Sequence, residues 1–385
     1  MSKQPPKVLN SFSTTPLPAR DKKWHEHVTI DVFLAVLNRT ILHPFVAWIL
    51  VLCLRAQVTP LTDTAFILAT GWAVLLTLLA AARMMNQRIA YGIPRPVDLN
   101  EEVVVVTGGA SGLGRLIAQV YGMRGVSVAV LDVREALDVD ELAGVEYYRC
   151  DIGDRKEVEA TRLKIEKDLG TPTILINCAA ARINGEPLLS LPAEAFQKTI
   201  QTNLLSVFHL CQVFLPGMLS AANGGTIVTV SSVLGHLSAA GLSDYAASKA
   251  GLSALHRTLE AELRTIAEDD MVKMLLVEIG QMSTPLFDWV KTPNRFFAPV
   301  LEPVQVAQAI VNAIDSGKGG VIRLPFFATW ISWYTVLPAS VQLIARYLSG
   351  IDNAVVNRSA KTQAPAGTGE PNETSEKESG GIDSD

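Results

Sequence analysis

A tyrosine and a lysine four positions apart are the residues best suited to chemistry. Tyr245-Ala-Ala-Ser-Lys249 opens a helical pattern, and Ser231-Ser232 ends the strand pattern before it. Residues i and i+4 lie on one helix face, one turn apart. A free tyrosine has a pKa near 10, and a neighbouring ammonium lowers it, which makes the phenol a usable acid or base. We expect Tyr245 to exchange a proton with a substrate oxygen held by Ser232. A solvated Tyr–Lys helix face is the alternative, and the next motif disfavours it.

A glycine-rich turn precedes this pair in the chain. The residues Thr107-Gly108-Gly109-Ala110-Ser111-Gly112-Leu113-Gly114 join a valine-rich strand pattern to a helical one. Glycines permit a tight turn and close approach of a pyrophosphate, and the following helix N-terminus offers free N–H groups. An acid, Asp132, lies 18 residues beyond Gly114 at the end of the next strand pattern. This context predicts a dinucleotide site.

Asp132 also indicates which dinucleotide binds. A carboxylate there accepts hydrogen bonds from the ribose hydroxyls of NAD and repels the 2′-phosphate of NADP. Ser111 supplies no cation for that phosphate, whereas Arg115 and Arg134 lie close by in the sequence. We therefore predict NAD, with NADP as the alternative.

Short apolar segments alternate with helical patterns from residue 101 onward, which predicts an α/β fold. We expect a Rossmann-like, doubly wound parallel sheet of seven strands with helices on both faces. The expected strands are Val103–Thr107, Val126–Leu131, Val145–Cys150, Thr173–Ile176, Thr226–Ser231, Val272–Glu278 and Val321–Leu324. The expected helices are Gly114–Arg124, Arg155–Leu169, Ala193–Met218, Tyr245–Ala267 and Pro303–Ser316.

Two uncharged apolar runs precede this domain, Ile41–Leu54 and Ala65–Ala82. A helix needs roughly 17–25 such residues to cross a bilayer, so the second run qualifies and the first is borderline. Interfacial helices, buried core helices and a cleaved signal peptide are the alternatives. Lys and Arg flank the pair and are sparse in the loop between the runs. The positive-inside tendency then predicts a membrane hairpin with the catalytic domain facing the cytosol.

The chain therefore divides into five expected parts. A polar N-terminal segment covers residues 1–28. A membrane anchor of one or two hydrophobic helices covers residues 29–90, and the dinucleotide-binding domain covers residues 101–324. An apolar segment at 325–350 contains Pro325 and Pro338, and we expect it to rest on the membrane or to cover the substrate pocket; a third pass is the alternative. Residues 357–385 are polar and are expected to be disordered.

Composition excludes several classes of protein. The net charge of −5 gives no basic footprint, so we expect no nucleic-acid partner. Four scattered cysteines without CxxC spacing predict neither a disulfide framework nor a zinc site, and no metal is expected. A hydrophobic fraction of 49% against 18% charged residues fits a chain with membrane-facing segments.

These motifs together resemble the short-chain dehydrogenase/reductase family over Glu101–Leu324. The glycine turn and Tyr245–Lys249 carry the resemblance, and the family's spacing of 13 residues selects Ser232 over Ser231. The resemblance implies that Tyr245 shuttles the proton, that Lys249 binds the nicotinamide ribose and lowers the tyrosine pKa, and that Asn203 supports a water relay. The cofactor-binding residues it implies, together with those above, are Gly108, Ser111, Gly112, Leu113, Gly114, Asp132, Asp151, Ile152, Asn177, Tyr245, Lys249, Gly280 and Thr284.

The sequence departs from the family pattern at two places. The family's NNAG run is Asn177-Cys178-Ala179-Ala180 here, which leaves less room beside the adenosine half of the cofactor. The family's Pro-Gly after the sixth strand is Ile279-Gly280, followed by Thr284 at the spacing of a nicotinamide-amide contact.

The N-terminal anchor narrows the resemblance to membrane-bound retinol and 17β-hydroxysteroid dehydrogenases, which act at the endoplasmic reticulum or on lipid droplets. This predicts a membrane-anchored oxidoreductase for a hydrophobic substrate, with a homodimer implied by helices that pair subunits in relatives. Four aromatics after the sixth strand, Phe287, Trp289, Phe296 and Phe297, either line an apolar pocket or pack a lid on the domain. The alternatives are an NADPH-dependent ketoreductase of acyl or sphingoid chains and a non-catalytic membrane or lipid-droplet scaffold.

Overall fold

The domain that begins near residue 101 is built on a seven-stranded parallel sheet with strand order β3-β2-β1-β4-β5-β6-β7. The computed structural model describes residues 29–134, 144–266, 270–287, 290, 292 and 294–355. The strands are β1 Val103–Thr107, β2 Ser127–Asp132, β3 Val145–Arg149, β4 Ile174–Asn177, β5 Gly225–Ser232, β6 Val272–Ile279 and β7 Gly320–Leu324. The predicted fold class is confirmed.

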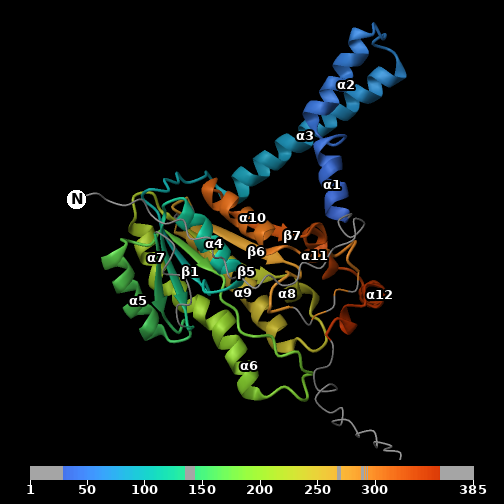
Figure 1. Ribbon diagram of the computed structural model, residues 1–385. Helices are drawn as coiled ribbons and strands as arrows, with labels where there is room; N and C mark the ends of the chain where they lie inside the picture. Colours follow the sequence, from blue (N-terminus) through green and yellow to red (C-terminus); the bar gives the residue numbers. More distant parts are fainter. Residues whose placement is uncertain are drawn as a thin grey trace, which may run out of the picture.

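Both faces of the sheet are buried, because successive residues of a strand point to opposite sides. Val104 and Val106 of β1 join the core under α4 and α10, whereas Val103 and Val105 join the core under α5, α7 and α9. The bounds of these helices are α4 Gly112–Met123, α5 Arg155–Asp168, α7 Ser206–Ser220, α9 Ser243–Thr265 and α10 Pro303–Asp315. Figure 1 shows the layers.

The strand order reverses between β1 and β4, at the centre of the sheet. Loops at the carboxyl ends of parallel strands diverge at such a switch point and leave a crevice for a ligand. The glycine turn after β1, Asn177 at the end of β4 and Ser232 at the end of β5 all lie along this edge. The fold therefore brings together residues that the sequence separates by more than a hundred positions.

The expected helix Ala193–Met218 is not one regular helix. It consists of α6 Ala193–Ile200, a π-helical segment Gln201–Leu205 and α7. Short π segments inside α-helices occur often at functional sites. This one contains Asn203.

Among the described residues, three helices precede the domain: α1 Ile30–Arg39, α2 Pro44–Ala56 and α3 Thr64–Tyr91. α2 and the first half of α3 project away from the sheet as a hairpin (Figure 1). Ala47 and Val51 of α2 pack against Ala73 and Leu76 of α3. α3 is long and apolar enough to cross a membrane, with a mean hydropathy of 2.1, and α1 and α2 pass the same test as one pair bent by 47°. The sequence predicted the two apolar runs but not α1.

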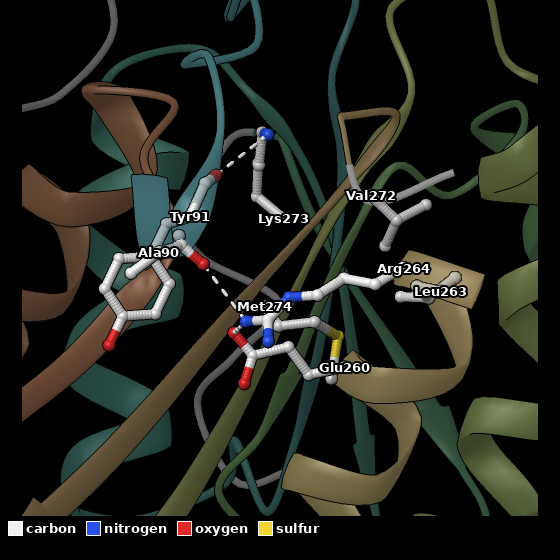
Figure 2. Close-up of a pocket in the computed structure, with 9 residues that line it drawn as sticks. Ala90, Tyr91, Glu260, Leu263, Arg264, Val272, Lys273 and Met274 are labelled. Carbon is white, nitrogen blue, oxygen red and sulfur yellow. Dashed lines mark hydrogen bonds and ion pairs between the residues drawn. The ribbon is translucent and has the colours of Figure 1, made fainter. Parts of the chain in front are cut away.

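α3 runs without a break from the hairpin into the domain. Arg264 donates to the carbonyl of Ala90 at 3.0 Å, and Lys273 to that of Tyr91 at 3.2 Å (Figure 2). These cations stabilise the negative C-terminal end of the helix. The cavity beside them measures about 20 Å³, which holds about one water molecule. This junction is a structural joint and is too small for a substrate.

The apolar segment after β7 folds as short elements. A 3₁₀ turn covers Phe326–Trp330, α11 covers Ile331–Tyr334 and α12 covers Ala339–Ser349. Each is shorter than the roughly 17 residues that a membrane span needs. The segments 1–28 and 357–385 lie outside the described residues.

Candidate active site

The glycine turn after β1 has the geometry that its sequence predicts. Gly108 has φ +67°, which favours glycine, and a Cβ there would lie 2.8 Å from the Cα of Ala179. A Cβ on Gly114 would lie 2.7 Å from the Gly108 carbonyl oxygen. Ser111 is the N-cap of α4, and Gly112 and Leu113 begin that helix. The turn therefore presents the N-terminus of α4 to the crevice, as a pyrophosphate site requires.

Asp132 is fixed beside this turn. Its carboxylate accepts the backbone N–H groups of Ala110 and Arg134, each at 3.1 Å. The side chain is half-buried at the end of β2. The Ala110 bond joins the predicted ribose contact to the predicted pyrophosphate turn.

Asp151 and Ile152 lie at the end of the next strand, β3. The Asp151 carboxylate accepts the backbone N–H of Gly153 at 2.9 Å, and its own N–H donates to Glu157. Ile152 is buried in the core. The acid is exposed at the same edge of the sheet as Asp132, where the adenine contact is expected.

The structure brings Ser232, Tyr245 and Lys249 together. All three are buried, with exposed fractions of 3–4%. The Ser232 hydroxyl lies close enough to the Tyr245 phenol to lower its pKa. The same hydroxyl donates to the Ile279 carbonyl at 3.3 Å and accepts the Leu234 N–H at 3.2 Å. Lys249 Nζ lies 5.7 Å above the centre of the Tyr245 ring and donates to the Val230 carbonyl at 2.8 Å.

Ser231 has a different environment from Ser232. Its hydroxyl donates to the Lys249 carbonyl at 3.1 Å and contacts the Ser253 hydroxyl at 2.8 Å. Both partners belong to α9, so Ser231 holds that helix against the sheet. This leaves Ser232 as the serine beside the tyrosine, as the family spacing predicts.

Burial controls the ionisation of the pair in this arrangement. It raises the pKa of Tyr245 to about 12, and the nearby Ser232 hydroxyl opposes this rise only in part. Burial also lowers the pKa of Lys249 to about 8. Desolvation therefore outweighs the lowering of the Tyr245 pKa that is expected from Lys249, whose Nζ lies over the face of the ring.

Asn203 is fully buried, and both ends of its side-chain amide are used. Its Oδ1 accepts the Ala181 N–H at 2.7 Å, and its Nδ2 donates to the Ser248 hydroxyl at 2.9 Å. Ser248 in turn donates to the Tyr245 carbonyl at 2.8 Å. Asn203 thus joins the strand-end loop after β4 to the helix that carries Tyr245 and Lys249.

Two buried polar groups at the crevice lack partners among the described residues. They are both amide atoms of Asn177 and the hydroxyl of Thr284. Unpartnered buried polar groups are costly, so they indicate a missing ligand or water. With the space that Gly108 and Gly114 leave open, these groups fit a nicotinamide dinucleotide.

Gly280 has a role that the sequence did not indicate. A Cβ there would lie 2.9 Å from Pro325 Cδ, and its N–H donates to the Leu324 carbonyl at 2.8 Å. The glycine allows the chain after β7 to approach the chain after β6. Its predicted contact with the cofactor stays a prediction.

An apolar cluster surrounds the Tyr245 ring. Phe287 meets it edge to face, with centroids 6.0 Å apart, so it packs beside the tyrosine. Phe296 and Phe297 meet edge to face and are 44% and 57% exposed, whereas Trp289 lies outside the described residues. The other members of the cluster are Ile183, Leu234, Ala239, Leu242, Leu286, Val290, Ile351 and Val355.

Sequence reasoning missed a buried ionic cluster below the site. Glu278 of β6 is fully buried and contacts His236 at 2.8 Å, Arg323 at 2.8 Å and Arg257 at 3.1 Å. These contacts lower its pKa below the ordinary value despite desolvation. The sequence signal that could have indicated this cluster is the single acid, Glu278, in the otherwise apolar end of the strand VKMLLVEI. His236 belongs to α8, Leu234–Leu237, a helix that begins two residues after Ser232.

Comparisons with known proteins agree with this geometry. The family model described as short chain dehydrogenase matches residues 102–294. The chain is similar to human retinol dehydrogenase 10, 30% identical over 320 residues, covering 74% of this chain and 90% of that protein. It is 32% identical to bovine short-chain dehydrogenase/reductase family 16C member 6 over 225 residues, 56% and 70% of the two chains. An uncharacterized oxidoreductase of Saccharomyces cerevisiae is 28% identical over 254 residues, 65% and 82% of the two chains.

Proposed function

We propose a reaction for this chain, which belongs to the short-chain dehydrogenase family and is an oxidoreductase acting on CH–OH groups. It is a membrane-anchored enzyme that transfers hydride between NAD and a hydroxyl or carbonyl group of a hydrophobic, lipid-like substrate. The observation that carries this proposal is the convergence of Ser232, Tyr245 and Lys249 beside the glycine turn.

Bound NAD supplies the hydride acceptor, and the protein's own residues hold the oxygen and move the proton. Ser232 donates a hydrogen bond to the substrate oxygen. Tyr245 exchanges the hydroxyl proton with that oxygen, and Lys249 receives or returns a proton because its pKa of about 8 lies near neutrality. Asn203 keeps the loop after β4 and α9 in register, and its predicted water relay would deliver the proton to solvent.

NAD is preferred because of Asp132. The carboxylate is held beside the turn by two backbone N–H groups, so it can accept hydrogen bonds from a ribose diol. A 2′-phosphate there would face a fixed negative charge. Tighter binding of NADPH than of NADH, measured by fluorescence, would contradict this assignment and favour the ketoreductase alternative.

The substrate class follows from two observations. Tyr245 lies in an apolar cluster, and similar proteins include retinol dehydrogenases. A lipid-like alcohol also partitions into a bilayer, where the α2–α3 hairpin would hold the enzyme. We propose a retinoid, steroid or similar lipid alcohol, at the endoplasmic reticulum or a lipid droplet, with the domain facing the cytosol. The implied homodimer and the lack of a nucleic-acid partner stay predictions.

The test is turnover by the purified full chain. With NAD and a panel of retinoid, steroid and long-chain alcohols, the absorbance of NADH should rise. Tyr245→Phe should reduce kcat/KM by about 10²–10⁴-fold, the usual contribution of an acid–base group, while NADH still binds. Full activity of this variant would refute the proposed role. Tight cofactor binding without turnover of any alcohol or ketone would favour the non-catalytic scaffold.

A further inference from the structure

The loop between Ser232 and Tyr245 contains a strained backbone position. After the single turn of α8, Ser238 has φ +47°. Non-glycine residues seldom adopt this conformation, and it persists only where the surroundings hold it. The contacts that hold Ser238 therefore also set the path of the chain that connects the two predicted catalytic residues.

Arg346 of α12 makes those contacts. Its Nη1 donates to the Leu237 carbonyl at 2.7 Å and its Nη2 to the Ser238 carbonyl at 2.9 Å. Its Nε donates to Asp352 at 3.1 Å, and a second ion-pair contact joins the same two groups. The planar guanidinium spans two carbonyls and a carboxylate at once, which the point charge of a lysine cannot do.

The chain after α12 lies on the same side of the site as Arg346. Asp352 accepts the Ala240 N–H at 3.4 Å. Ile351 and Val355 belong to the apolar cluster around Tyr245, and Val355 pairs with Val290. The segment from Arg346 to Val355 therefore covers the loop and the tyrosine from outside.

The opposite face of α12 is apolar and exposed. Ile344 and Leu348 are two positions from Arg346 and so lie about 200° around the helix from it, with exposed fractions of 58% and 77%. Leu343 and Tyr347 of the same helix, and Trp330 and Trp333 before it, are also exposed. No charged residue occurs between Pro325 and Ala345. Aromatic and aliphatic side chains together, without charge, are typical of a membrane interface.

The N-terminal helices contact the chain at the start of this apolar segment. The first turn of α1 is bonded to the chain after β7 and to the loop after β6, because Asp31 accepts the Phe326 N–H at 2.9 Å and the Ile30 N–H donates to the Phe296 carbonyl at 3.1 Å. In Figure 1 α1 reaches the domain beside α11 and leads directly into α2. A bilayer that holds the hairpin is therefore the occupant that this geometry favours over another protein.

We infer that Arg346 is a positioning residue through which α12, resting on a lipid bilayer, holds the loop between Ser232 and Tyr245 in its catalytic arrangement. The inference rests on the proposed function for its activity readout. It adds a lipid contact to the described site and makes turnover depend on that contact.

The experiment compares full-length variants reconstituted in phosphatidylcholine vesicles. They are Arg346→Ala, Arg346→Lys, the double variant Ile344→Glu/Leu348→Glu, and Arg155→Ala as control. Arg155 also pairs with an acid, Glu159, but this pair lies on α5 and both of its side chains are half-exposed. Three quantities are measured: kcat and KM for an alcohol, NADH binding, and amide hydrogen exchange of residues 234–242.

In Arg346→Ala we expect kcat at least tenfold lower, KM and NADH binding near wild type, and exchange in 234–242 at least tenfold faster. Arg346→Lys should be intermediate, and it keeps the test usable if the alanine variant does not fold. The double variant should lower kcat and speed the exchange by two- to fivefold, although Arg346 is intact. Arg155→Ala should match wild type.

Wild-type exchange in both Arg346 variants would overturn the positioning role. Wild-type exchange and kcat in the double variant would overturn the lipid contact. If the wild-type enzyme oxidised no alcohol, the proposed function would fail, and hydrogen exchange alone would still decide this inference.

Discussion

Two 28-residue apolar helical stretches in this protein have different surroundings. α3, Thr64–Tyr91, and the α6–α7 stretch, Ala193–Ser220, are both long and apolar enough to cross a membrane, with mean hydropathies of 2.1 and 1.3. Only 11% of the apolar window of α3 is buried by the rest of the protein, against 39% in α6–α7. Leu210 of α7 is fully buried against the sheet, whereas Leu75 of α3 is 46% exposed.

The comparison shows that hydropathy predicts an apolar environment but not which one. α7 packs against β4, β5 and α5, and the neighbouring π segment holds Asn203 at the site. α3 contacts α2 along one stripe and leaves the rest of its apolar circumference uncovered. A helix that is apolar all round is buried in protein or in lipid, and for α3 we propose lipid.

Matched leucine truncations should separate the two stretches most strongly. Leu210→Ala leaves a cavity in the domain core and should lower the unfolding free energy by about 2–5 kcal/mol. Leu75→Ala should lower it by less than about 1 kcal/mol, because solvent or lipid fills the space. Pulse proteolysis in urea on the detergent-solubilised chain measures both. Equal losses would mean that α3 belongs to the domain core.

Acid should destabilise the domain and leave the hairpin unaffected. Burial lowers the pKa of His256 to about 4 from 6.5. Between these values the unfolded chain binds more protons, so stability falls as pH drops from 6.5 to 4, by about 3 kcal/mol. The run Ala65–Ala82 has no titratable side chain. The fraction of the protein that stays bound to vesicles should therefore not change with pH. His256→Gln is the control, and an undiminished pH dependence in it would assign the effect elsewhere.

Side-chain hydrogen bonds in the two stretches should also contribute differently to stability. Asn203→Ala leaves the Ala181 N–H and the Ser248 hydroxyl without that partner and should cost about 1–3 kcal/mol. Thr77 of α3 accepts from Trp48 Nε1 at 2.9 Å and donates to the Ala73 carbonyl. Thr77→Val should cost about 0.6 kcal/mol, as such bonds do within membranes. Urea denaturation and hairpin thermal stability in micelles measure these changes, and a larger loss at Thr77 would reverse the comparison.

The domain's activity should also depend on pH, with a rising limb below pH 8. Burial lowers the pKa of Lys249 to about 8, and the Tyr245–Lys249 pair must have lost a proton before it can accept one from an alcohol. Oxidation should therefore rise about tenfold per pH unit below pH 8 and level off above it, equivalent to about 1.4 kcal/mol per unit. In Lys249→Met the limb should move toward the Tyr245 pKa of about 12. An unchanged limb in this variant would show that another group titrates.

The fold could be predicted from sequence because local patterns and the sheet agree. β1 has the predicted bounds, and the other strands differ from prediction by no more than one residue at either end. The α3 extension to Tyr91 was missed because Arg83 and Arg88 end the apolar run while Met, Gln and Arg still favour helix. α1 was missed because its ten residues are too few and too polar on one face to resemble a span.

At the site, sequence spacing predicted which residues converge but not their electrostatics. A lysine one turn from Tyr245 predicts a lowered pKa, whereas burial, which depends on Phe287 and the chain after α12, raises it. The contact of Arg346 with Ser238 joins residues 108 positions apart, and no local pattern in the sequence encodes it. Long-range packing decided both outcomes.

The continuous α3 has a consequence for how substrate is found. Its final carbonyls are held by Arg264 and Lys273, and Gln87 donates to the Gly319 carbonyl at 2.8 Å. With the hairpin in a bilayer, this stem leaves the domain little freedom to tumble. Encounter with a membrane-dissolved alcohol then becomes lateral diffusion in two dimensions, and the rate should scale with the mole fraction of alcohol in the lipid rather than with its molarity in water.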